Sequence, residues 1–525
     1  MSSITTSAYT SREAVDESHK TLFATFATGR TKSLAWRRWQ LKQLWFLVAD
    51  NEERIVEAMK TDLNRHRFET TLGDIGVVKG DVLSHLQHMD EWTADEALDA
   101  GFLARYFTGG RIRKDPLGVA LIIGAWNFPF ALVLQPMIAA ITAGCCVMLK
   151  PSELPAASQN LLAELVPKYM DPQAVRIVTG GAQETAYILE KRFNHIFFTG
   201  STTVAKFVAA AAAKHLTPTV LELGGQGPGI VTKSADIELA AKRITYAKFQ
   251  NAGQICVSVN HVFAEPEIAD QLVERMKYWN GQYLSKGSNM MCRVINDRNY
   301  GRLQGLLDKT SGKVAYTGVS DPKSLFFHPT IVDNVTMDDS LLSEELFGPI
   351  CPVVRASVDE AVAAINRLPE PLALYIFGRD QQVIDSVLDR TLSGGVTINN
   401  VLFHAGMPSA PFGGVGDSGS GAYHGRHGVD AFVHRRAVAH PPSWIDRLMG
   451  FTYSPYDDKY LSWIATKGGK GWKRGATLED EERAGSGGSW GKLLSSSVLA
   501  VAVGAVGYAA LTAQGQSRVA AAFNR

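Results

Sequence analysis

Short apolar runs and longer helical stretches alternate through the first half of the chain. The apolar runs cover residues 119–123, 145–149, 175–178, 195–198 and 220–223, and glycine or Lys-Pro follows each of them closely. Residues 129–142 and 202–215, which lie between such runs, have the composition of helices. Apolar runs of four or five residues bounded by turn residues are typical of strands buried on both faces. The alternation therefore predicts βαβ units, a mostly parallel sheet and an α/β fold.

The regions on either side of this one differ in the elements that they predict. Residues 18–108 read as mostly helical. In the second half, residues 237–250 and 268–278 are predicted helices that flank a predicted strand at 261–264. The second half thus continues the α/β alternation, while the N-terminal part is expected to supply helices that cover the sheet.

The C-terminal part departs from both patterns. After about residue 442 the alternation decays, and residues 485–489 are rich in Gly and Ser, which predicts a flexible linker. Residues 493–513, LLSSSVLAVAVGAVGYAALTA, carry no charged side chain. As a helix rising ~1.5 Å per residue, this segment can cross a hydrocarbon core of ~30 Å. We therefore expect a transmembrane anchor there, with a buried core helix as the alternative.

Composition excludes several classes of function. Of the 525 residues, 46% are hydrophobic and 20% are charged, which is typical of a globular chain and argues against disorder. The net charge of +1 gives no basis for general nucleic-acid binding. The five cysteines form no CxxC pair and no metal-ligand spacing with histidine, so neither a disulfide framework nor a metal site is expected.

Four positions could carry chemistry, and each also has an ordinary structural explanation. Gly200-Ser201 lies between a strand and a helix, where backbone N–H groups can meet a phosphate, although the GxGxxG and P-loop motifs are absent. Glu222 ends a predicted strand, and Asn127 follows another, where its amide could stabilise an oxyanion or close a turn. Cys256 could be a nucleophile or a small buried apolar residue. With His261 nearby in sequence, a Cys–His hydrolase also stays open.

Seven stretches, taken together, resemble the aldehyde dehydrogenase superfamily and occur in its order. They are residues 116–119 (PLGV), 124–129 (GAWNFP), 149–153 (LKPSE), 198–201 (FTGS), 221–225 (LELGG), 253–256 (GQIC) and 344–349 (EELFGP). The resemblance spans about residues 20–445. Residues 411–425, PFGGVGDSGSGAYHG, look like the class 3 branch, which includes fatty aldehyde dehydrogenases.

The resemblance implies a role for each matching residue. Cys256 falls at the nucleophile, Glu222 at the general base, and Asn127 at the oxyanion hole together with the Cys256 backbone N–H. Trp126 falls beside the substrate. For the cofactor, taken as NAD with NADP possible, the resemblance implies contacts from Lys150 and Glu153 to the adenosine ribose, from Gly200 and Ser201 to the pyrophosphate, and from Glu345 and Phe347 to the nicotinamide riboside.

The resemblance also implies a domain plan, that of the aldehyde dehydrogenase fold: a Rossmann-like NAD-binding domain, an α/β catalytic domain and a small β oligomerisation element. Residues 1–222 would form mainly the NAD-binding domain with part of the bridging element, and residues 223–415 the catalytic domain. Residues 416–445 would return to the bridging element. Residues 446–490 would be tail and linker, ahead of the anchor at 493–513. A homodimer is implied in the same way.

The expected anchor narrows the substrate and the location. A tethered enzyme gains most from a substrate that itself partitions into lipid, at about 0.8 kcal/mol per buried CH₂. We therefore expect NAD-dependent oxidation of a long apolar aldehyde to its acid, with a fatty aldehyde first and an apocarotenal second. The alternative from another class of function is a membrane-tethered scaffold protein that keeps the fold without catalysis. Because the anchor lies so near the C-terminus, we expect insertion after synthesis, with the catalytic domain facing the cytosol.

Overall fold

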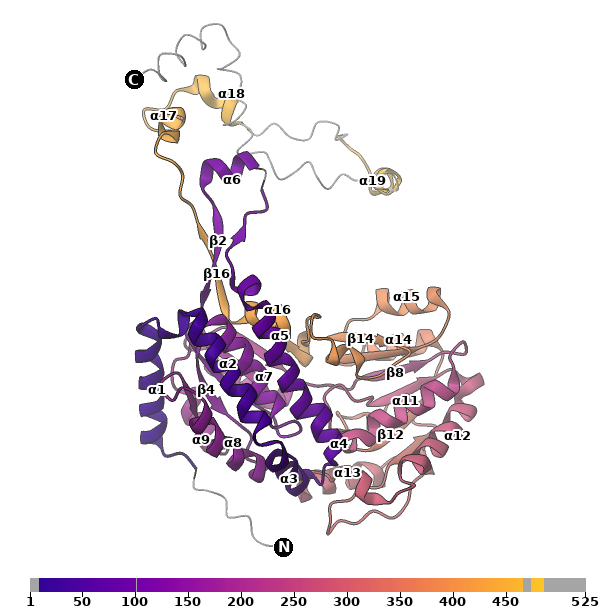
Figure 1. The fold of residues 1–525 in the computed structure, drawn as a ribbon. Helices are drawn as coiled ribbons and strands as arrows, with labels where there is room; N and C mark the ends of the chain where they lie inside the picture. Colours follow the sequence, from indigo (N-terminus) through magenta and orange to yellow (C-terminus); the bar gives the residue numbers. More distant parts are fainter. Residues whose placement is uncertain (1–8, 101, 466–473, 486–525) are drawn as a thin grey trace. The chain divides into compact units, whose positions relative to one another are not determined.

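The protein is described here by a computed structural model that covers residues 9–100, 102–465 and 474–485 (Figure 1). Contacts within the chain divide it into two units. Unit 1 combines Met1–Thr93 with Pro116–Val433, and unit 2 combines Ala94–Asp115 with His434–Arg525. Every residue that the sequence analysis assigned to the active site belongs to unit 1.

The first sheet of unit 1 has six strands in the order β15-β7-β6-β3-β4-β5. The strands are β3 (Val119–Ile123), β4 (Cys146–Lys150), β5 (Val175–Ile177), β6 (His195–Thr199), β7 (Thr219–Glu222) and β15 (Gly419–Ser420). Five of them run parallel, whereas β15 is antiparallel to β7 and places Gly419 opposite Glu222. Since all parallel strands end at one edge, the residues that follow them are gathered on that edge.

Helices cover this sheet in layers (Figure 1). Helix α7 (Ala131–Ala143) is apolar on nearly every side and packs against β3 and β4, while α2 (Leu34–Ala49) and α5 (Gly76–Thr93) pack against α7. A helix that is apolar all round must be buried on both sides, which explains its place between the sheet and the outer helices. The other helices of this half are α1 (Arg12–Ala27), α3 (Glu52–Leu63), α4 (Arg67–Thr70), α8 (Ala156–Tyr169), α9 (Ala182–Leu189), α10 (Thr202–Ala213) and α16 (Gly425–Ala431).

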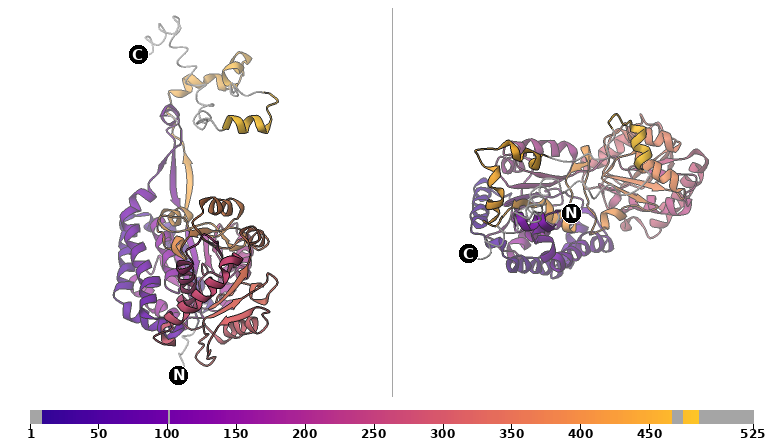
Figure 2. Two further views of the ribbon diagram at one scale, coloured as in Figure 1. Left: turned by 90° about the vertical axis from the view of Figure 1, so that its right-hand side faces the viewer. Right: turned by 90° about the horizontal axis from the view of Figure 1, so that it is seen from above.

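The second sheet of unit 1 has seven strands in the order β10-β11-β12-β9-β8-β13-β14. It lies beside the first half of unit 1 (Figure 2). Its strands are β8 (Pro228–Val231), β9 (His261–Ala264), β10 (Lys313–Tyr316), β11 (Thr330–Asp333), β12 (Ile350–Arg355), β13 (Ala373–Phe377) and β14 (Gly395–Ile398). All pairs are parallel except β10 with β11. The main helices of this half are α11 (Ile237–Phe249), α12 (Pro266–Tyr283), α13 (Asp297–Asp308), α14 (Val358–Ile365) and α15 (Gln381–Arg390).

Nearly all residues of a three-stranded sheet belong to unit 2. Its order is β1-β2-β16, formed by Glu96–Ala97, Arg111–Pro116 and Val433–Val438. Ion pairs such as Arg436 with Asp115 at 3.0 Å link its charged strands. The helices of unit 2 are short: α6 (Phe102–Thr108), α17 (Ile445–Met449), α18 (Leu461–Ile464) and α19 (Leu478–Gly485).

The α/β fold predicted from the sequence is confirmed, whereas the predicted domain boundaries stay predictions. The expected anchor at 493–513 lies outside the described residues. Within the residues that are described, none of the helices combines the length and the apolar character needed to span a bilayer.

Candidate active site

The chain reaches Cys256 through a tight reversal. After α11 it enters a short 3₁₀ turn, η3 (Gln250–Gly253), in which Asn251, Ala252 and Gly253 have φ values of 49°, 54° and 69°. A Cβ atom at Gly253 would lie 2.4 Å from the backbone oxygen of Gly348, so the position has room only for glycine. The reversal places Cys256 at the start of a loop that leads into β9.

The Gln254 side chain fixes this loop. Its amide nitrogen donates to the backbone oxygens of Asn251 and Arg293, both at 3.0 Å, and its oxygen accepts the N–H of Ile295 at 3.0 Å. Gln254 is fully buried, and its bonds with Asn251 and Ile295 are shielded from water. The loop that carries the candidate nucleophile is therefore held in place by buried hydrogen bonds.

Cys256 is a free cysteine and is half-buried. Burial raises the pKa of Cys256 to about 12, and the carboxyl groups of Glu345 and Glu222 act in the same direction. The N–H groups of Val257 and Cys256 itself oppose them. Because these three side chains interact, Cys256, Glu222 and Glu345 lie in one site. The remaining cysteines, Cys145, Cys146, Cys292 and Cys351, are buried.

Glu222, at the carboxyl end of β7, is only 2% exposed. Neither of its carboxyl oxygens has a hydrogen-bond partner among the described residues. Burial raises the pKa of Glu222 well above its usual range. A buried carboxyl group without a partner is costly, and such groups cluster at functional sites, where a raised pKa suits proton transfer near neutral pH.

Asn127 follows β3 and lies beside the Cys256 loop. Its buried amide nitrogen donates to the backbone oxygen of Gln254 at 3.0 Å, which leaves the second N–H for an oxygen of the substrate. The neighbouring Trp126 ring packs edge-on against Phe347, with centroids 5.2 Å apart. The structure therefore places Asn127 beside the loop that carries Cys256, and Trp126 beside Phe347.

Glu345 lies against the glycine pair that follows Glu222. A Cβ atom at Gly224 would come within 2.6 Å of both Glu345 carboxyl oxygens, and the N–H of Gly225 donates to that carboxyl group. Burial raises the pKa of Glu345 to about 7. Phe347, two residues further on, has a φ of 46°, a strained conformation of the kind that is concentrated at functional sites.

The remaining predicted cofactor residues follow the parallel strands β4 and β6. Lys150 ends β4, and its ammonium lies 3.1 Å from Glu153. Ser201 caps α10, and the N–H of Gly200 donates to the backbone oxygen of Glu222 at 3.0 Å. The positive end of a twelve-residue helix at the carboxyl edge of a parallel sheet suits a pyrophosphate. These residues therefore fit a dinucleotide. The N-terminus of α10 would contact its phosphates, and the Lys150–Glu153 pair would contact a ribose.

Three residues of this site gave no sequence signal. Tyr375 and Tyr423 read as core aromatics, yet the Tyr375 hydroxyl donates to the backbone oxygen of Val257. Burial raises the pKa of Tyr423 well above its usual range, and its phenol interacts with Glu222 and Cys256. The third residue is Arg65, which lies in a polar stretch of sequence that is typical of the protein surface. Its guanidinium donates to the backbone oxygen of Asn127. Only the folded chain reveals that these side chains reach the site.

Comparison with known proteins identifies the family of this chain. The sequence model of the aldehyde dehydrogenase family matches residues 2–438. The chain belongs to this family. As an aldehyde dehydrogenase it is an NAD- or NADP-dependent enzyme that acts on an aldehyde, which excludes the Cys–His hydrolase.

Individual relatives show the same match over most of their length. The dehydrogenase is 41% identical to the dimeric NADP-preferring aldehyde dehydrogenase of Rattus norvegicus, over 78% of this chain and 91% of that protein. It is 38% identical to the beta-apo-4'-carotenal oxygenase of Neurospora crassa, over 85% of this chain and 84% of that protein. A substrate-bound structure of Staphylococcus aureus AldH covers 84% of this chain and 99% of its own, with a TM-score of 0.79 and 33% identity.

The arrangement suits the oxidation of an aldehyde. The bound dinucleotide accepts a hydride. Cys256 is placed to add to the carbonyl carbon, the free Asn127 N–H to stabilise the oxyanion, and Glu222 to take up a proton and later to activate water that hydrolyses the thioester. These individual roles are the ones implied by the resemblance, and they stay predictions.

Proposed function

We propose that this dehydrogenase oxidises a long, apolar aldehyde, with a fatty aldehyde as the first candidate. The observation that carries the proposal is an open apolar hollow of about 450 Å³ lined by Phe68, Thr71, Leu72, Gly76 and Val77. Its volume falls in the range of sites for small molecules. Phe68 and Leu72 are 66% and 54% exposed, although both would favour contact with a hydrocarbon.

One contact joins the lining segment of the hollow to the residue next to the proposed oxyanion donor. Gly73 lies within its lining segment, and a Cβ atom there would be 3.0 Å from the ring of Phe128. Phe128 directly follows Asn127, the proposed oxyanion donor. A substrate whose carbonyl meets Asn127 can therefore pass its chain along Phe128 towards Leu72.

A polyene aldehyde such as an apocarotenal is the second candidate, supported by the similarity to the Neurospora crassa enzyme. Such a chain is equally apolar, so the hollow suits it too. A non-catalytic scaffold is not favoured, because Cys256, Glu222 and Asn127 are all present and adjacent.

The test is a panel of short, fatty and polyene aldehydes given to the purified enzyme with NAD or NADP, following absorbance of the reduced cofactor. We expect Leu72→Ser to raise KM about tenfold for long aldehydes, the effect of one lost apolar contact, and to leave short ones unchanged. Val319→Ser, at an exposed apolar position outside the hollow, is the matched control. Equal losses on short and long aldehydes would contradict the proposed binding surface, and a higher kcat/KM with polyenes would favour the apocarotenal.

We further propose that the C-terminal segment at 493–513 anchors a homodimeric enzyme to a membrane, with the catalytic domain facing the cytosol. The uncharged sequence supports the anchor, and the dimeric rat relative supports the oligomeric state. Deleting residues 491–525 should release the protein from vesicles and preserve turnover of a short aldehyde. Continued sedimentation with vesicles would reject the anchor, and a monomeric mass in light scattering would reject the dimer.

NAD is proposed as the preferred cofactor. The support is Glu153, whose carboxylate would repel the 2′-phosphate of NADP if it meets the adenosine ribose. Its pairing with Lys150 weakens that repulsion, so use of both cofactors fits the structure as well. The same panel, run with each cofactor, measures the preference.

A further inference from the structure

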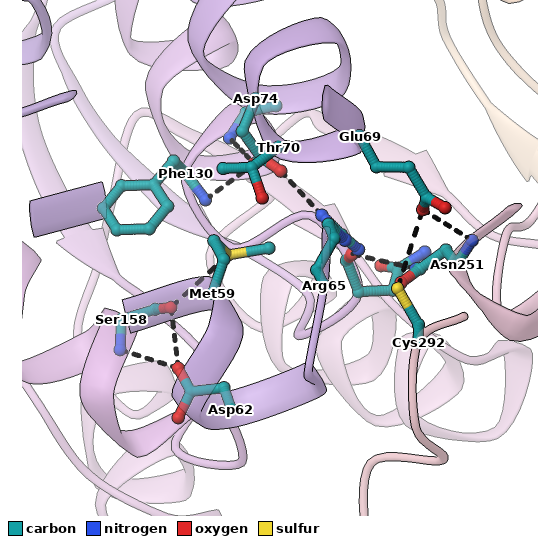
Figure 3. Close-up of polar contacts among 12 residues, drawn as sticks. Met59, Asp62, Arg65, Glu69, Thr70, Asp74, Phe130, Ser158, Asn251 and Cys292 are labelled. Carbon is teal, nitrogen blue, oxygen red and sulfur yellow. Dashed lines mark hydrogen bonds and ion pairs between the residues drawn. The ribbon is translucent and has the colours of Figure 1, made fainter. Parts of the chain in front are cut away.

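A fully buried ion pair joins Arg65 and Asp74 (Figure 3). Arg65 follows α3, and one arm of its guanidinium is 2.8 Å from Asp74 in a single π-helical turn, η2 (Thr71–Ile75). The other Asp74 oxygen accepts the N–H groups of Phe130 and Ala131, at 3.2 and 2.9 Å, where α7 begins. Buried guanidinium groups are rare and persist only when they are paired and hydrogen-bonded.

The second arm of Arg65 reaches the backbone of Asn127. It donates to the Asn127 backbone oxygen, and the guanidinium lies over the Phe128 ring, 4.6 Å from its centroid. The Asn251 side chain donates to the same oxygen at 3.1 Å. The peptide that carries the proposed oxyanion donor is therefore held from two sides.

Hydrogen bonds continue from this peptide to the nucleophile loop. The amide nitrogens of Asn127 and Asn251 both donate to the backbone oxygen of Gln254, each at 3.0 Å. The backbone N–H of Asn251 donates in turn to Glu69 at 2.9 Å. Arg65, two asparagines and the Gln254 peptide thus form one buried chain of contacts that ends two residues before Cys256.

We propose that Arg65 is a positioning residue of the oxyanion site. Its planar, two-armed guanidinium fixes the Asn127 backbone relative to α7 and thereby directs the Asn127 amide. Arg65 itself does not touch the substrate. The proposal rests on Asn127 as the oxyanion donor and is independent of the length of the aldehyde.

The guanidinium geometry is what the proposal requires. Lysine keeps the charge opposite Asp74 but supplies a single point donor, so it cannot hold Asp74 and the Asn127 oxygen in one plane. Donors displaced by a fraction of an ångström lose much of their effect on a transition state. Arg65→Lys should therefore lower kcat/KM for a short soluble aldehyde by about 10- to 100-fold.

The matched control is Arg37→Lys. Arg37 is also a buried arginine, and it donates to the backbone oxygens of Thr31, Lys32 and Thr142, away from the oxyanion site. We expect Arg37→Lys to lower the melting temperature while kcat/KM stays within twofold. Both variants should keep the cofactor dissociation constant. If Arg65→Lys also lowers only the melting temperature, the role is structural and the proposal fails.

A double-mutant cycle with Asn127→Ala separates positioning from general damage. If Arg65 acts through the Asn127 amide, Arg65→Lys should cost less than a further twofold once that amide is gone. A multiplied loss in the double variant would overturn the proposal, as would full activity of Asn127→Ala alone.

If Arg65→Lys does not fold, the pair Arg65→Gln with Asp74→Asn replaces it, since this pair removes both members of the ion pair together. The same loss and the same lack of additivity with Asn127→Ala are expected, and additivity again rejects the proposal. Because a short aldehyde is used throughout, failure here is distinct from failure of the long-chain substrate proposal.

Discussion

At the scale of single residues, the site combines a proposed nucleophile and a proposed base whose pKa values are both raised. Burial raises the pKa values of both Cys256 and Glu222, and the Glu222 carboxyl group raises the pKa of Cys256 further. A protonated thiol is a poor nucleophile and is protected from oxidation and alkylation. The enzyme therefore depends on proton removal within the catalytic cycle.

This protonation state predicts the alkylation behaviour of Cys256. Without cofactor, its rate of reaction with iodoacetamide should be low at pH 7 and rise about tenfold per pH unit to beyond pH 10, past the range of an ordinary thiol near ~8.5. Peptide mass spectrometry identifies the labelled site, and the buried cysteines serve as internal controls. A rate that levels off below about pH 9 would show that the thiol is not shielded in this way.

At the scale of elements, sequence patterns predicted strands better than turns. The apolar runs at 119–123 and 261–264 match β3 and β9 to the residue. These strands are buried on both faces, so local composition alone marks them. The left-handed turn of η3 gave no such signal, because Gly348 and residues 293–295, far along the chain, determine it.

The same contrast holds within the site. Residues at strand ends, such as Glu222 and Asn127, could be singled out because α/β sheets gather their ligands at that edge. Their roles came from the resemblance, since local spacing left a surface carboxylate and a turn amide open. Arg65 could not be found, because burial of a charged side chain depends on a partner, Asp74, that local sequence does not identify.

At the scale of the whole molecule, two buried histidines link stability to pH. His195 and His261 lie on β6 and β9, and burial lowers the pKa of each to about 3. Neither ring nitrogen of His195 has a partner among the described residues. Below about pH 6.5 the unfolded chain binds a proton at each of these positions and the folded chain does not, so both destabilise the fold as pH falls.

His195→Gln should remove one of these contributions. As the pH falls from about 6 to about 4, the free energy of unfolding of the variant should rise relative to that of wild type by about 1.4 kcal/mol per pH unit. Urea denaturation at each pH measures this difference. A pH-independent offset from the changed packing does not affect this slope. Parallel stability curves for His195→Gln and wild type would contradict the assignment.

The pairing of β15 with β7 bears on when the enzyme becomes competent during synthesis. Glu222 ends a strand whose antiparallel edge partner is Gly419–Ser420, and the N–H of Leu223 donates to the backbone oxygen of Ser418. Contacts between such distant residues form late, because a long loop must close first and the later residues must have left the ribosome. The pairing of the strand that carries the proposed base is therefore completed only after the strands of both sheets have been translated. Cys256 therefore leaves the ribosome well before residues 418–420, so a nascent chain that already exposes this thiol still lacks the completed strand that carries Glu222.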